Sequence, residues 1–210
     1  MKRFIIGLLL TLLLFSAFAI ETKYDSFGVH CSVPLVFETA NDDGITTNSR
    51  ATSIGFGIHA LSLYTDRLGL YANLDLFFPQ KMRTDLSYGG SSYSYEVSRS
   101  DYNSLWGMTL LLGPGICITN SDSMLFTISP GLHYMMLVAN SSSSSSVSYL
   151  FGIGANIQDS IFFAENGYLT IGADIAYDFL GFSLVNGHSN SNNGRDFIIN
   201  PKIGVGLKFK

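Results

Sequence analysis

Apolar residues recur at every second position along most of the chain beyond Ser26. Between residues 68 and 78, Leu, Ala and Phe fill the even positions, while Gly, Tyr, Asn and Asp fill most of the odd ones. The same alternation runs through 169–179 and 197–209. A period of two is the signature of a strand with two different faces. The pattern therefore predicts an all-β chain.

Applied to the whole chain, this template predicts strands at 26–37, 51–63, 68–78, 104–118, 124–139, 148–163, 168–181 and 197–209. The connections alternate in length. Short turns are expected at 64–67, 119–123 and 164–167, and longer polar loops at 38–50, 79–103, 140–147 and 182–196. An even strand number with short turns at one end and long loops at the other is typical of outer-membrane barrels. We expect an eight-stranded antiparallel up-and-down transmembrane β-barrel.

A soluble, lipocalin-like barrel is the alternative, because it also has eight alternating strands. The chain has 210 residues, of which 47% are hydrophobic and 13% are charged, against about 25% charged in soluble domains. Gly, Ser and Asn dominate one face of each strand and Leu, Ile, Phe and Val the other. Small residues suit a crowded lumen, so the bulky face is expected to meet lipid. The net charge of −4 gives no basic surface for nucleic acid.

The first 19 residues have the order of an export signal. Met1-Lys2-Arg3 is positively charged, residues 4–15 are apolar, and Ala17-Phe18-Ala19 has the small residues that signal peptidase reads. We expect a signal peptide at 1–19 and the barrel at 20–210. An N-terminal membrane anchor is the alternative, although the apolar run is shorter than the roughly 20 residues of a spanning helix.

Aromatic residues are expected in two belts at the membrane surfaces. The belt near the long loops would contain Phe77, Phe78, Trp106, Tyr149, Phe151, Tyr177, Phe179 and Phe197. The belt near the short turns would contain Tyr24, Phe27, Tyr64, Phe162, Phe163, Tyr168 and Phe209.

The signal end Ala17-Phe18-Ala19, the eight alternating strands, the four long loops and the apolar last strand resemble the small outer-membrane barrels of the OmpA, OmpX and OmpW type. The resemblance implies the outer membrane of a diderm bacterium, with extracellular loops, periplasmic termini, and outer-membrane lipid and the barrel-assembly machinery as partners. Those families usually end on an aromatic residue, whereas Lys210 follows Phe209 here. A likeness to the OmpW type would imply a sideways path for apolar solutes.

The strand register predicts a polar network in the lumen, formed by His30, His59, Asp75, His133, Asp174, Asp178 and Lys202. Folding the last hairpin about residue 189 places Lys202 opposite position 176. A buried charge needs a partner, so an ion pair from Lys202 to Asp174 or Asp178 is expected. The network would either plug the barrel or line a gated path for ions or small solutes.

No cofactor and no metal is expected. His30 and His59 lie on neighbouring strands, but no acidic residue or Cys obviously completes a set of three or four ligands. Cys31 and Cys117 are predicted on opposite faces of the barrel and therefore unpaired.

We expect no enzymatic activity. His188, Ser189, Ser191 and Asp196 in the last loop are the local candidates for a nucleophile and base. A His beside Ser in a loop rich in Ser, Asn and Gly is ordinary turn chemistry. A lipid A-modifying enzyme remains the remote alternative.

The longest loop contains Tyr88, Tyr93, Tyr95 and Tyr102 among Ser and Gly. This composition suits adaptable contacts with host or extracellular ligands, and the alternation of Tyr93 and Tyr95 equally indicates that the neighbouring strands extend above the membrane. The function expected from sequence is a monomeric structural or narrow, porin-like barrel for small or apolar solutes, with a surface adhesin as the alternative.

Overall fold

A computed structural model describes residues 22–42, 45–192 and 195–209. The expected signal peptide lies outside these residues. The strands are β1 (Tyr24–Ser32), β2 (Leu35–Asp42), β3 (Ile45–Leu63), β4 (Leu68–Tyr88), β5 (Ser91–Ser98), β6 (Ser104–Asn120), β7 (Met124–Asn140), β8 (Ser145–Phe162), β9 (Gly167–Val185), β10 (His188–Asn192) and β11 (Arg195–Lys208). One 3-10 turn, η1 (Arg99–Asp101), follows β5. No helix in the described part of the chain is long and apolar enough to cross a membrane.

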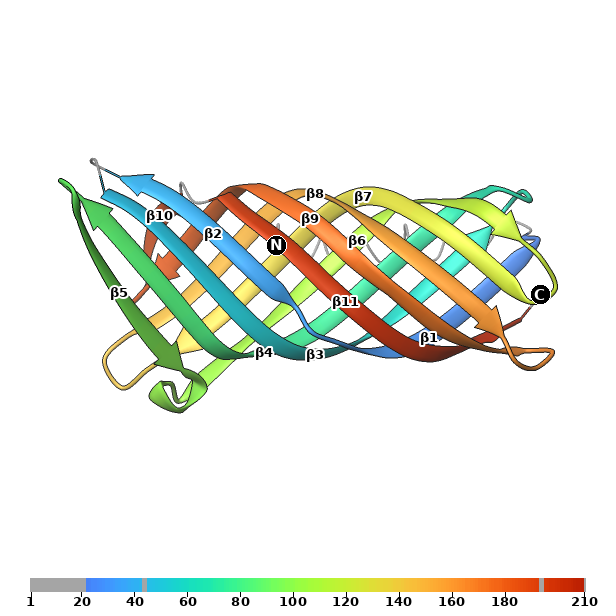
Figure 1. Cartoon of the computed structure of the whole chain (residues 1–210), viewed down its shortest axis with the longest axis horizontal. Coiled ribbons are helices and arrows are strands. Elements are labelled where there is room, and N and C mark those ends of the chain that lie inside the picture. Colours follow the sequence, from blue (N-terminus) through green and yellow to red (C-terminus); the bar gives the residue numbers. More distant parts are fainter. Residues whose placement is uncertain (1–21, 43–44, 193–194, 210) are drawn as a thin grey trace.

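Antiparallel pairing closes the sheet into a barrel (Figure 1). β1 and β2 occupy one position in the ring, because each pairs with β3 on one side and β11 on the other. They are separated at Pro34, which has no N–H to donate to the ladder, while its carbonyl accepts a hydrogen bond from the Ser53 N–H at 2.9 Å. The ring therefore has eight positions, as the sequence predicts.

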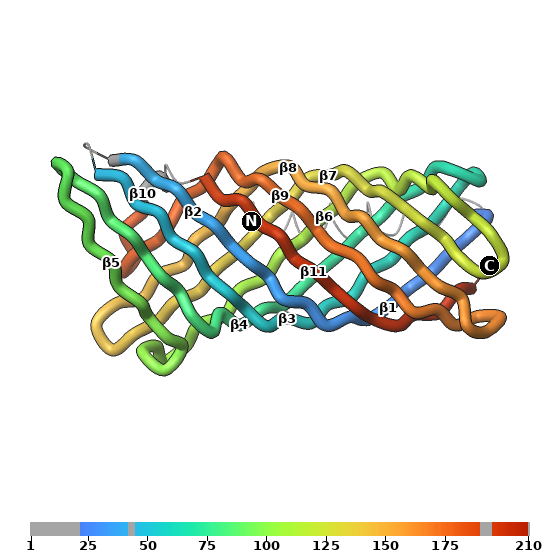
Figure 2. Tube along the Cα trace, viewed as in Figure 1, coloured from blue at the N-terminus to red at the C-terminus, as the bar shows by residue number. Residues whose placement is uncertain are grey.

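The two ends of the barrel differ. Short turns join β3 to β4, β6 to β7 and β8 to β9, whereas β5 and β10 lie at the opposite end (Figure 1). The strands run obliquely around the barrel (Figure 2). β4 has 21 residues, about twice the 9 to 11 that a tilted strand needs to cross a bilayer. The excess length forms a rim above the membrane at the end that bears the long connections.

The loops expected at 38–50 and 79–103 are largely strand, which corrects the sequence interpretation. β2 and β3 stay paired from Leu35 to Asp42, and β4 folds back onto β5 to form a separate hairpin. These segments have polar residues on both faces, so they lack the hydrophobic alternation that reveals a half-buried strand.

Side chains alternate between the lumen and the outer surface. Ile54, Phe56 and Ile58 are 60%, 54% and 42% exposed on β3, whereas the adjacent Ser53 and His59 are buried. Three expected belt residues, Phe77, Tyr24 and Tyr168, are instead buried in the lumen, because consecutive strand residues point to opposite faces. Cys31 is exposed and Cys117 buried, and both are free thiols, so the two cysteines face opposite sides as predicted.

Candidate functional site

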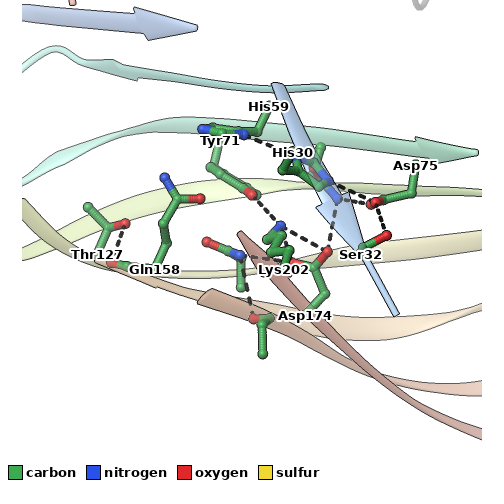
Figure 3. Close-up of polar contacts among 12 residues, drawn as sticks. His30, Ser32, His59, Tyr71, Asp75, Thr127, Gln158, Asp174 and Lys202 are labelled. Atoms are coloured by element: carbon green, nitrogen blue, oxygen red, sulfur yellow. Dashed lines mark hydrogen bonds and ion pairs between the residues drawn. The ribbon is translucent and has the colours of Figure 1, made fainter. Parts of the chain in front are cut away.

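Lys202 on β11 lies at the centre of the polar lumen. Its Nζ donates hydrogen bonds to Asp174 Oδ1 at 2.8 Å and Oδ2 at 3.0 Å, and to the Tyr71 hydroxyl at 2.9 Å (Figure 3). The ammonium and the carboxylate are almost completely buried. Of the two partners that the sequence offered, the structure forms the ion pair with Asp174.

The expected register of this hairpin was wrong. Lys202 lies opposite Gly172 rather than position 176. The turn is centred on Asn186-Gly187, where both residues have positive φ, and not on residue 189. Moving the centre of a hairpin by about two residues shifts the residue that lies opposite any given position by about four. This accounts for the difference between positions 172 and 176.

Asn73 connects this ion pair to a second carboxylate. Its Nδ2 donates to Asp174 Oδ2 at 2.9 Å and also to Asp75 Oδ2. Asn156 Nδ2 donates to Asp174 Oδ1 at 2.8 Å, and the Ser32 hydroxyl donates to Asp75 Oδ1 at 3.1 Å. Each buried carboxylate is thus held by several donors, which buried charges require.

Two neighbouring histidines extend the network away from Asp75. His30 Nε2 lies 2.8 Å from Asp75 Oδ1, and His30 Nδ1 lies 3.2 Å from His59 Nδ1. His59 Nε2 lies 3.1 Å from the Tyr168 hydroxyl. With both imidazoles neutral, the donors form one directed series: Tyr168 O–H to His59, His59 N–H to His30, and His30 N–H to Asp75. In this arrangement both nitrogens of each ring have a hydrogen-bond partner, except that His30 and His59 share the contact between their Nδ1 atoms.

Glycines make room for these rings. A Cβ at Gly28 would lie 2.5 Å from His59 Cε1 and 2.9 Å from the Tyr168 hydroxyl. A Cβ at Gly57 would lie 2.7 Å from His30 Nε2 and 2.9 Å from Asp75 Oδ1. The glycines on the luminal face of the strands thus leave the space that the larger luminal side chains fill.

His133 and Asp178, the remaining predicted luminal residues, form a separate pair. His133 Nδ1 lies 2.8 Å from Asp178 Oδ1 and 3.0 Å from Oδ2, with both side chains buried. No described hydrogen bond joins this pair to the Lys202 network. The predicted luminal residues therefore form two groups rather than one.

Apolar side chains close the lumen on both sides of the Lys202 network. At the end with short turns, a buried cluster contains Tyr24, Leu61, Leu63, Tyr71, Leu111, Cys117 and Leu125. Toward the long connections, a second buried cluster contains Phe77, Met135, Leu150, Ala176 and Ile198. Beside this second cluster lies a cavity of about 60 Å³, lined in part by Val36, Met82 and Asp196. The Lys202–Asp174 pair thus lies between two apolar layers, one toward each aqueous side.

The candidate metal ligands and the candidate nucleophile and base do not come together in one site within the described residues. The described residues contain no group of three or more His, Cys, Asp or Glu placed to hold a metal ion. His188 is exposed beside the β9–β10 turn, whereas Asp196 is buried on the luminal side. His188 and Asp196 therefore lie in different environments.

The tyrosines of the long connection are divided between two places. Tyr88, Tyr93 and Tyr95 belong to the β4–β5 hairpin and are 65%, 66% and 41% exposed. The rings of Tyr93 and Tyr95 lie 6.2 Å apart. Tyr102 follows η1, is half-buried and does not belong to the hairpin.

Sequence reasoning missed Tyr71, Tyr168 and Ser32 as members of the luminal network. Tyr71 was visible on the polar face of its strand, between Gly69 and Asn73. A large aromatic on a face otherwise made of small and polar residues is the signal that would have identified it.

Comparison with known proteins gives the fold a context. No protein-family model matches the chain, and no curated protein matches its sequence. Among solved structures, the outer membrane protein OprG of Pseudomonas aeruginosa is similar, with a TM-score of 0.58 and 10% identity over 90% of this chain and 98% of that one. Ail, the attachment invasion locus protein of Yersinia pestis, has a TM-score of 0.51 and 10% identity over 90% of this chain and all of the other.

A major outer membrane protein of Thermus thermophilus also has a TM-score of 0.51, at 12% identity over 88% of this chain and 99% of that one. At these identities the likeness concerns the fold. The chain has the fold of the small outer-membrane β-barrels, and its band of exposed apolar side chains suits the outer membrane of a diderm bacterium.

Proposed function

We propose that this outer-membrane barrel is a closed, non-conducting scaffold whose β4–β5 hairpin makes contacts with ligands at the cell surface. The observation that carries the proposal is the buried Lys202–Asp174 ion pair, whose ammonium also reaches across the lumen to the Tyr71 hydroxyl. An ion that crossed the barrel would have to displace this pair and both apolar clusters. Closure leaves the extracellular rim as the part of the molecule that is free to act.

The hairpin suits such a role. Tyr93 and Tyr95 lie opposite Leu86 and Thr84 in the register, so their rings and that of Tyr88 project from the same face of the hairpin. Tyrosines lose little conformational entropy on binding and offer both apolar surface and a hydroxyl. A paired strand holds them in place before any ligand arrives, which reduces the cost of ordering them.

A narrow path for small or apolar solutes is the second candidate. The 60 Å³ cavity between Met82 and Asp196 at the outer end of the lumen supports it. Such a path would require the apolar cluster around Phe77 and Met135 to rearrange. We further propose a monomer that the barrel-assembly machinery inserts into the membrane.

Planar-bilayer recording of the refolded protein tests closure. The proposal expects no conductance steps from the wild type, and steady single-channel conductance would reject it in favour of the narrow path. Lys202→Met serves as a second sample. If Lys202 were the gate of a path through the lumen, this variant would conduct ions that the wild type does not.

Adhesion of bacteria that express the protein tests the hairpin. Binding to a panel of immobilised glycans and extracellular-matrix proteins should fall several-fold in Tyr93→Ser/Tyr95→Ser. Ser87→Ala/Ser92→Ala changes the other face of the same hairpin and provides the control. Equal binding by all three proteins and by cells without the barrel would remove the contact role.

A further inference from the structure

The basic residues at the extracellular end of the barrel all face outward. They are Arg50 on β3, Lys81 and Arg83 on β4, Arg99 in η1 and Arg195 on β11, and all five are exposed. On the luminal side of the same end lie Asp178 and Asp196, both buried, and the half-buried Glu38. The cationic side chains of this rim therefore lie on its outer side, and the buried acidic side chains lie on its luminal side.

A β-bulge produces this arrangement on β4. Thr52 pairs with Lys81 and Ser53 with Pro79, so Gln80 is an extra residue in the ladder. An inserted residue shifts the alternation by one position. As a result Lys81 and Arg83 project outward beside Arg50, while Met82 and Thr84 face inward.

One cross-strand row connects these cations to the aromatic belt. In the register, Phe197 lies opposite Phe37, Phe37 opposite Arg50, Arg50 opposite Arg83, and Arg83 opposite Glu96. The rings of Phe197 and Phe37 lie 6.5 Å apart on the outer surface. Aromatic rings favour the membrane–water boundary, so the arginines follow directly where the apolar surface ends.

The height above the hydrocarbon fits a headgroup. Ile54 on β3 faces outward and lies opposite Phe78. Arg50 lies four residues from Ile54 along the same strand, toward the extracellular end. That distance is about 13 Å along the strand and roughly 10 Å along the membrane normal after the strand tilt. The headgroup layer adds about 5 to 8 Å on each side of the hydrocarbon, so an arginine side chain at this height can turn back to reach it.

The charges are only partly compensated. Lys81 Nζ lies 3.3 Å from Glu96 Oε1, and Arg83 Nε lies 3.1 Å from Asp85 Oδ1, with all four side chains well exposed. Arg50 and Arg195 form no ion pair within the described residues. The Arg99 guanidinium lies over the ring of Phe78, 5.4 Å from its centroid. Positive charge therefore remains at the membrane surface.

We propose that this outward surface, which we call the basic rim (Arg50, Lys81, Arg83, Arg99 and Arg195), binds the phosphate groups of anionic glycolipid headgroups in the outer leaflet. Guanidinium groups match phosphate with two parallel hydrogen bonds. The lipid chains would lie along the apolar strands below, where Ile54 and Phe56 are exposed. This inference concerns the lipid-facing surface and is independent of the contact role of the tyrosines.

Native mass spectrometry of the refolded, detergent-solubilised protein tests the proposal, with bisphosphorylated lipid A as the probe. Arg50→Gln/Arg83→Gln should weaken lipid A binding at least tenfold. Lys23→Gln/Arg67→Gln at the other end is the matched control, because it also removes one ion-paired and one unpaired exposed cation, and it should stay within twofold of the wild type. Equal weakening in both variants would overturn the proposal.

Two further measurements distinguish lipid-bound phosphate from free phosphate and cover the case of a variant that does not refold. Dephosphorylated lipid A should bind at least tenfold more weakly, and inorganic phosphate at equal phosphate concentration should not compete. Equal binding without phosphate, or competition by free phosphate, would overturn the lipid assignment. If the double variant does not refold, the wild type decides: its affinity for lipid A should fall several-fold between 0.05 M and 0.5 M KCl, and a salt-independent affinity would refute the basic rim.

Discussion

Lys202 and Asp174 form a buried ion pair on the neighbouring strands β11 and β9, although they are not opposite each other in the register. Lys202 lies opposite Gly172, and Asp174 lies opposite Asn200. Gly172 has no side chain, so the lysine reaches diagonally to the carboxylate two residues along β9, at 2.8 Å. The same reach brings its ammonium to Tyr71 on the other side of the barrel.

Removal of this lysine should destabilise the barrel strongly. Lys202→Met leaves Asp174 buried without its cation, which costs about 3 to 5 kcal/mol in comparable cases. Urea unfolding in lipid vesicles, followed by the heat-dependent shift in gel mobility, measures the free energy of unfolding. We expect Lys202→Met/Asp174→Leu to recover a large part of the loss, because neither charge then remains buried. If the double variant lost as much free energy of unfolding as Lys202→Met and Asp174→Leu lose together when measured singly, the two groups would not interact.

Any side chain at Gly57 should lower the stability of the barrel. A Cβ there would meet the Leu74 carbonyl oxygen, and His30 and Asp75 at 2.7 Å and 2.9 Å. Gly57→Ala should lower the free energy of unfolding by about 1 to 3 kcal/mol, the usual cost of overpacking. Gly115→Ala is the control, because its Cβ would meet only the flexible end of Leu61 at short range. The same urea titration compares the two, and equal stability of both variants would contradict the close packing around His30.

The sequence was most informative where a strand has one lipid face and one luminal face. The alternation of Leu70 and Leu74 with Asn73 and Asp75 predicted the strand, its orientation and the luminal residues, because each face has a different environment. The last hairpin shows what was overlooked. Asn186-Gly187 is a strong two-residue turn signal, and centring the hairpin there would have placed Lys202 close to Gly172.

Other features lie beyond the reach of the alternation. The strand β5 (Ser91–Ser98) has solvent on both faces, so no period distinguishes it from a loop. The bulge at Gln80 depends on pairing with β3, which is a long-range property. Only Tyr93 and Tyr95, two residues apart, indicated a strand there.

The β4–β5 hairpin should depend on its two glycines. Gly89 and Gly90 connect Tyr88 to Ser91 and have φ values of 57° and 83°. A side chain in this left-handed region costs about 1 to 2 kcal/mol. Gly90→Val should therefore raise amide hydrogen exchange along β5 about tenfold and leave the exchange of the membrane strands unchanged. Ser92→Ala is the control, and unchanged protection of β5 in Gly90→Val would show that the turn does not hold the hairpin.

The same hairpin should loosen in acid. Asp85 lies above the membrane, where hydrogen bonds from Ser94 and Arg83 lower the pKa of its carboxyl below the ordinary value of 3.8. A lowered folded-state pKa means that the contribution of the carboxylate is fully present above pH 3.8 and is lost as the pH falls through the lower folded value. The carbon NMR titration of the Asp85 carboxyl should therefore show a midpoint below 3.8, accompanied by weaker protection of β5 amides. Asp85→Asn should have weak β5 protection at every pH, because the amide cannot ionise. A midpoint at or above 3.8, or β5 protection in Asp85→Asn that still changes over this pH range, would assign the acid response to another group.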